Sequence, residues 1–211
     1  MIRDTLAQPP LKAFVVAIGL FYALAWSTAM YTQPIAEDLA LSAGLAEAQL
    51  VPLLGWLYAG FSGVSAVVSF HADRIEALVG PERWALVAPA LLGVAFLATA
   101  LVPVLAIPSF FLMRALLHTT DVLKDRHLNE HAESLGRTTV LSAASMVLGL
   151  ARVPFRLLSG AVGDLTSPIG AVGSMGTLLV VGIAGVALLT GLGRRSGPDG
   201  EDGDACTGEA V

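Results

Sequence analysis

The sequence contains few charged residues: Asp, Glu, Lys and Arg make up 14% of its 211 positions, against roughly a quarter in soluble globular domains. Its single cysteine, Cys206, excludes an intramolecular disulfide. It also lacks a glycine-rich phosphate loop, a His-Glu-x-x-His pair and a Gly-x-Ser-x-Gly nucleophile turn, which are signatures of nucleotide-binding and hydrolytic enzymes. We therefore expect neither an enzyme nor a bound cofactor.

Long apolar runs are the main feature that is present. Hydrophobic residues make up 55% of the chain, and its mean hydropathy is +0.74. A helix needs about 20 apolar residues to cross the hydrocarbon core of a bilayer. We therefore expect an all-α membrane protein with one domain, residues 13–192, and six transmembrane helices at 13–32, 50–70, 84–102, 104–123, 139–163 and 170–192.

The segments that flank this domain are short. Residues 1–12 lead directly into a span that is too long for the apolar region of a signal peptide and ends without a small-residue cleavage site. We therefore expect no cleavable signal peptide and a cytoplasmic N-terminal segment. Residues 193–211 hold acidic residues among glycines, a composition that predicts a disordered cytoplasmic tail.

Lysine and arginine occur only in alternate loops. None is found in the connections 33–49, 103 and 164–168. Apart from three arginines inside the spans, all of them lie before the first span, after the second, after the fourth or after the sixth. Because positive charge in short loops marks the cytoplasmic side, we expect a multi-pass protein of the cell membrane with both termini in the cytoplasm.

The arginines inside the spans are the most unusual feature. A charge at that depth is costly, so it generally faces a protein interior or a water-filled path. On the fourth span, Arg114, His118 and Asp121 share one helical face, and on the fifth span Arg152 and Arg156 do. With a rise of about 1.5 Å per residue, the three arginines lie roughly 6 to 12 Å below the outer face, in one layer.

These residues suggest a site that binds or couples a substrate. Guanidinium groups hold anions through planar donors, and His118 with Asp121 would form a protonatable pair able to couple transport to protons. Alternatively, Arg114 or Arg152 pairs with Asp121, and the other arginines extend outward to lipid headgroups.

The first span offers a face suited to stacking and hydrogen bonding. Tyr22, Trp26 and Gln33 lie within a narrow arc of the helix. Alternatively, Gln33 is an anchor at the membrane interface. The third and sixth spans contain no charged residue and are expected to face lipid.

Three histidines gather near the cytoplasmic end of the fourth span. His127 and His131 lie four residues apart and follow His118, which is an acceptable spacing for metal ligands on a helix. Charged segments at helix ends are usually solvated faces, so we expect no metal site. The alternative is a small membrane enzyme that holds a metal with these histidines.

Two span ends resemble each other. Ser69 lies four residues before Asp73 at the end of the second span, and Gly160 lies four residues before Asp164 at the end of the fifth. The two spans hold corresponding places in two three-span units of opposite orientation, as an inverted repeat requires.

The loop after the second span carries a recognisable pattern. Asp73-Arg74 followed by Arg83 is similar to G-x-x-x-D-R-x-G-R-R, a loop signature of the major facilitator superfamily, with Ser69 and Glu76 in place of its glycines. Residues 8–14 and 136–142 are similar to that family's linker before its seventh helix and to the start of its eleventh. The chain resembles the C-terminal six-helix half of such a transporter.

This resemblance implies a 3+3 inverted repeat, a gating role for Asp73, Arg74 and Arg83, and a cavity lined by the spans that carry charge. It implies a secondary active transporter that moves a small solute by alternating access, with anions favoured by the arginines. Because one half supplies only one wall, we expect either a homodimer or a separate N-terminal half as the partner, and no nucleic acid. The alternative is a non-transporting membrane partner or an inactive truncated fragment.

Overall fold

The structure is a computed structural model that describes residues 9–131 and 137–190. Within these ranges, the side chains of residues 9–13, 15, 76, 81–82, 127–131, 137–144, 147–148 and 190 are outside the description. The expectations for residues 1–8 and for the acidic tail, 191–211, therefore fall outside the described residues.

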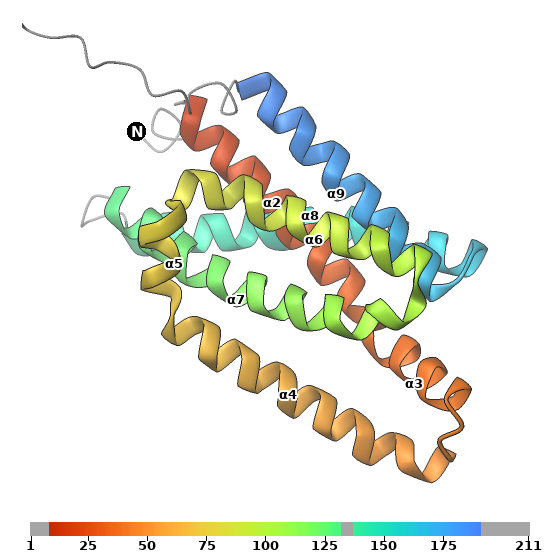
Figure 1. Cartoon of the computed structure of the whole chain (residues 1–211). Coiled ribbons are helices and arrows are strands. Elements are labelled where there is room, and N and C mark those ends of the chain that lie inside the picture. The colour runs from red at the N-terminus through yellow and green to blue at the C-terminus, as the bar shows by residue number, and fades with distance from the viewer. Residues whose placement is uncertain (1–8, 132–136, 191–211) are drawn as a thin grey trace, which may run out of the picture.

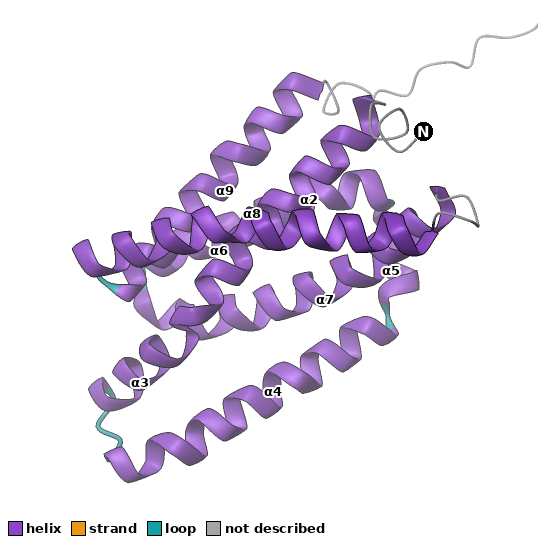
Figure 2. Cartoon of the chain, turned by 180° about the vertical axis from the view of Figure 1, so that it is seen from behind, coloured by secondary structure: helices purple, strands orange, loops and turns teal. Residues whose placement is uncertain are grey.

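Every regular element in the described part is a helix, so the expected all-α class is confirmed (Figure 1; Figure 2). The elements are α2 (Pro9–Thr28), η1 (Ala29–Tyr31), α3 (Thr32–Ser42), η2 (Glu47–Gln49), α4 (Leu50–Phe70), α5 (Ala72–Val79), α6 (Pro81–Leu101), η3 (Pro103–Leu105), α7 (Ala106–His131), α8 (Arg137–Leu165) and α9 (Pro168–Thr190).

In the described part, four stretches are long and apolar enough to cross a membrane: Glu47–Phe70, Arg83–Leu101, Pro103–Arg126 and Pro168–Leu189. They correspond to four of the six expected spans and indicate a membrane-embedded, multi-pass protein. The other two expected spans, 13–32 and 139–163, coincide with α2–η1 and with α8. Side chains of α2 and α8 are described only in part, and the crossing of the membrane by these two helices stays a prediction.

The first expected span ends differently from the prediction. The helix continues through η1 into α3 and stops at Ser42, inside the expected loop 33–49. It stops there because Gly44 adopts a positive φ of 87°, and the amide of Leu45 donates to the carbonyl of Ala40 while that of Gly44 donates to Leu41. This is the hydrogen-bond pattern of a glycine-terminated helix end.

The helices pack in pairs. The most extensive contact is between α6 and α9; α2 packs on α8 and α9, and α7 packs on α4 and α6. Both views place α4 along one edge of the molecule (Figure 1; Figure 2), and Phe61 is its only described buried side chain.

The crossing of α6 and α9 is close because glycines face each other there. A Cβ on Gly93 would lie 2.7 Å from a methyl carbon of Val180 and 3.1 Å from the carbonyl oxygen of Gly176. A Cβ on Gly176 would lie 2.9 Å from the carbonyl oxygen of Gly93. Small residues at such crossings let helix backbones approach each other in membranes.

The core lies between α2, α6, α7 and α9. Its largest fully buried side chains include Phe21, Phe96, Phe110, Met113 and Met175. The expectation that the third and sixth spans face lipid holds only for their outer sides: α6 and α9 bury one side against each other and expose apolar side chains on the other.

Polar groups inside this core are paired. The indole N–H of Trp84 donates to the hydroxyl of Thr120 over 2.9 Å, and the hydroxyl of Thr99 donates to that of Ser109 over 3.0 Å. Because an unpaired buried polar group is costly, these bonds stabilise the contact between α6 and α7.

Candidate functional site

Two of the arginines that were predicted to lie inside the membrane meet at one aromatic ring. Arg114 on α7 and Arg152 on α8 place their guanidinium carbons 5.6 Å and 5.4 Å from the centre of the Trp26 ring on α2. Arg114 also lies 5.7 Å from the centre of the Phe61 ring. These distances are those of cation–π contacts. Three helices that are far apart in sequence thus build one cluster, Arg114–Trp26–Arg152.

Both arginines in this cluster keep a polar atom without a partner. The Nε atoms of Arg114 and Arg152 are buried, and no described atom accepts a hydrogen bond from them. No described carboxylate forms an ion pair with either arginine. Because guanidinium groups cannot be deprotonated in proteins, the cluster carries two positive charges.

Asp121 is engaged elsewhere. The hydroxyl of Tyr22 donates to its carboxylate, and the ammonium of Lys124 lies 3.2 Å from the same oxygen. Lys124 also lies 3.4 Å from Asp125 and 5.0 Å from the centre of the Tyr22 ring. No ion pair joins Arg114 or Arg152 to Asp121 in the described part, so the alternative in which one of them pairs with Asp121 is not seen in this structure.

Tyr22 connects this acidic group to the arginine cluster. Its side chain is buried, and its ring centre lies 5.8 Å from the guanidinium carbon of Arg152. One ring thus contacts two cations from α7 and α8 while its hydroxyl is committed to Asp121. The structure thus joins Tyr22 to Asp121 and to Arg152, while Trp26 contacts the two arginines.

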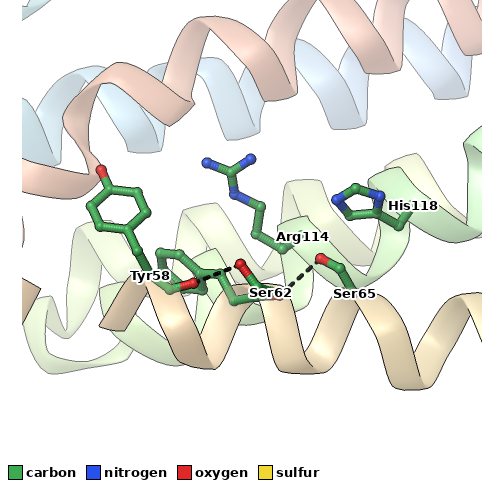
Figure 3. A pocket seen from close by; sticks show the side chains of 6 residues that line it. Tyr58, Ser62, Ser65, Arg114 and His118 are labelled. Carbon is green, nitrogen blue, oxygen red and sulfur yellow. Dashed lines mark hydrogen bonds between the residues drawn. The ribbon is translucent and has the colours of Figure 1, made fainter. Parts of the chain in front are cut away.

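A cavity of about 350 Å³ lies between α4 and α7 beside Arg114. Its lining comes from both helices: Tyr58, Phe61, Ser62, Ser65, Arg114 and His118. Figure 3 shows Arg114 and His118 reaching into the space above the serines of α4. No hydrogen bond between His118 and Asp121 occurs in the described part, so the expected protonatable pair is not formed directly.

The α4 side of this cavity was not predicted. The hydroxyls of Ser62 and Ser65 donate to the carbonyls of Tyr58 and Phe61 over 3.0 Å and 2.8 Å, which leaves their oxygens able to accept. The polar positions 58, 62 and 65 recur at helical spacing in an otherwise apolar span. That spacing is the signal that would have found them.

Two other predicted residues lie outside the cluster. Arg156 is exposed, and no interaction joins it to another described residue. Gln33 is also exposed, and its amide donates to Glu37 over 2.9 Å on the surface of α3. This geometry favours the interpretation of Gln33 as a surface residue rather than a binding one.

The residues of the expected loop signature lie at the surface. Asp73 on α5 forms an ion pair with Arg126 at the end of α7, with 3.1 Å between the charged atoms. Arg74 and Arg83 are exposed. The ion pair joins α5 to α7, but exposed pairs of this kind contribute little to stability.

Metal ligands do not gather in the described part: it contains no group of three His, Cys, Asp or Glu side chains that could hold a metal ion. The side chains of His127 and His131 lie outside the described residues.

No protein-family model matches the chain, and the searches of curated proteins and of solved structures also give no match. The resemblance to the major facilitator superfamily therefore depends on the residues named above and is an inference from sequence.

Proposed function

We propose that the chain is one six-helix half of a secondary active transporter of the major facilitator type, which moves a small solute by alternating access. The observation that carries this proposal is the cluster Arg114–Trp26–Arg152. In a membrane-embedded protein, charged groups that face the interior usually mark the path of a substrate or an ion. Here they come from three different helices and share one aromatic ring.

The packing pattern supports an inverted repeat of three helices. In such a repeat, α2, α4 and α6 of the first unit correspond to α7, α8 and α9 of the second. The contact of α2 with α8 then corresponds to that of α7 with α4, and the contact of α2 with α9 to that of α7 with α6; all four contacts are present. The contact of the closest pair, α6 with α9, corresponds to itself. This relation is expected when two three-helix units of opposite orientation form one half of such a transporter.

Exposed apolar side chains on α4 and α8 leave a surface that a second unit could cover. Trp56 on α4 is 79% exposed and Leu157 on α8 is 72% exposed. In this transporter class the two halves are related by an axis along the membrane normal. A second copy of this chain in the same orientation would bring α4 of one copy to α8 of the other and close the site with two walls.

A non-transporting role is the alternative. It is favoured by the ion pair between Asp121 and Lys124, because a carboxylate with a purely structural role forms such a pair as well. In that case the chain would be a membrane partner of another protein, or an inactive fragment.

Exchange of labelled solutes across vesicles that contain the purified full-length chain tests the proposal. We expect exchange of organic anions that falls at least 10-fold in Arg114→Gln and Arg152→Gln and is unchanged in the matched control Arg156→Gln. Absence of exchange for anionic and neutral solutes alike, with a monomeric mass by light scattering, would favour the non-transporting role.

A further inference from the structure

The guanidinium groups of Arg114 and Arg152, which form no ion pair with a described residue, point to a ligand of this chain. A buried donor without an acceptor costs about 1–3 kcal/mol, and a folded protein seldom keeps two of them on neighbouring side chains without a use. Arg114 and Arg152 keep these donors although their guanidinium groups are held in place by Trp26. The donors are therefore positioned but not satisfied.

The carboxylates on α7 do not neutralise this cluster. Asp121 accepts from Tyr22 and Lys124, and Asp125 lies beside Lys124. Both carboxylates thus pair with Lys124, which lies further towards the predicted cytoplasmic end of α7 than Arg114 does. Neither guanidinium group at Trp26 forms an ion pair with a described carboxylate.

The surroundings limit the size and kind of ligand. Trp26 is 37% exposed, so the cluster is accessible from one side. Arg114, but neither Arg152 nor Trp26, also lines the 350 Å³ cavity, together with His118. A cavity of this size lies in the lower part of the range known for small-molecule sites.

We propose that Arg114 and Arg152 together bind one small organic dianion, a dicarboxylate, with one carboxylate on each guanidinium group beside Trp26. A dianion neutralises both cations, whereas a monoanion leaves one of them unpaired in a region of low dielectric constant. Planar carboxylates also match the paired donors of arginine. The inference deepens the proposed function, and only its role as the transported substrate rests on that function.

Calorimetric titration of the full-length protein in an uncharged detergent tests the site, with sodium succinate as the probe. We expect succinate to bind at least 10 times more tightly than acetate. Arg114→Gln and Arg152→Gln should each weaken succinate binding by about 10-fold or more, the loss expected for one charged hydrogen-bonding group. Arg114→Lys should weaken it less, because the charge is kept and only the planar donors are lost.

The control is Arg156→Gln, an exposed arginine on the same helix as Arg152, which should change affinity by less than about 2-fold. Circular dichroism and elution volume verify that each variant is folded. Equal affinities for acetate and succinate, or unchanged succinate binding in both folded glutamine variants, would overturn the proposal.

A lipid headgroup offers the same oxyanion chemistry as a soluble dianion. Succinate binding that persists after addition of phosphatidylglycerol supports the soluble ligand, and its loss on that addition overturns it. If succinate binds through the arginines but vesicles exchange no succinate, the proposed function fails and the site stands. If the glutamine variants bind and exchange solutes as the wild type does, the site fails and transport stands.

Discussion

The crossing of α6 and α9 and the cluster Arg114–Trp26–Arg152 are built on opposite principles. At the crossing, glycines bring two backbones together and leave no room for another carbon atom, and the nearby hydroxyl of Thr99 is hydrogen bonded. At the cluster, charged side chains are held in place but keep free donors. The first region is suited to stability and the second to binding. Substitutions should therefore lower the stability of the fold at the crossing and raise it at the cluster.

The largest effect is expected at the crossing. Gly176→Ala places a Cβ 2.9 Å from the backbone carbonyl oxygen of Gly93, and a backbone atom cannot move aside as a flexible side chain can. Overpacking of this kind costs about 1–3 kcal/mol, so the thermal unfolding midpoint in detergent should fall. The control is Gly63→Ala on α4, where nothing lies within 4 Å of the added Cβ; an equal fall in that variant would contradict the account.

An intermediate effect is expected at the carboxylate beside the cluster. Asp121→Asn removes the charge that pairs with Lys124 and accepts from Tyr22. The side chain of Asp121 is partly exposed, so solvent screening reduces the loss to about 1 kcal/mol. Asp125→Asn, at the more exposed partner of Lys124, is the matched control and should cost less in the same thermal unfolding measurement. A larger loss of stability in Asp125→Asn would mean that Asp125, and not Asp121, is the main partner of Lys124.

The smallest effect, and the one of opposite sign, is expected at the cluster itself. Arg114→Met removes an uncompensated charge and an unpaired donor while it keeps an unbranched side chain. We expect the unfolding midpoint to rise, by the equivalent of about 0.5 kcal/mol, together with loss of succinate binding. Arg156→Met should leave both quantities unchanged. A lower midpoint in Arg114→Met would mean that this arginine stabilises the fold and is not held for a ligand.

Much of the fold could be predicted from the apolar runs and from the polar residues that interrupt them. The expected span 50–70 coincides with α4, and the start of α9 lies two residues before the expected span. The extension of the first helix to Ser42 was missed because its polar surface resembles a loop by composition. Its end is set by the backbone conformation of Gly44, which an apolar pattern does not encode.

The site was predictable in part, for a physical reason. Helical periodicity places Arg152 and Arg156 on one face, yet only Arg152 reaches Trp26, because the crossing of α8 over α2 decides which turn lies against the ring. The pairing of Asp121 with Lys124 and Tyr22 also depends on tertiary packing. Sequence spacing identified Asp121, but it could not tell whether Lys124, Arg114 or Arg152 would form an ion pair with it.

The most direct test of the proposed two-copy assembly is disulfide cross-linking between two copies of the chain after the single native cysteine has been replaced. In a Cys206→Ser background, Trp56→Cys on α4 and Leu157→Cys on α8 place exposed thiols at similar heights in the proposed membrane orientation, and Val94→Cys, at an exposed position of α6, is the control. Mild oxidation in membranes should give a covalent dimer when the variants at 56 and 157 are co-expressed, and none for Val94→Cys. Cross-linking through position 94 alone, without any between 56 and 157, would contradict an assembly in which two copies face each other across the arginine cluster.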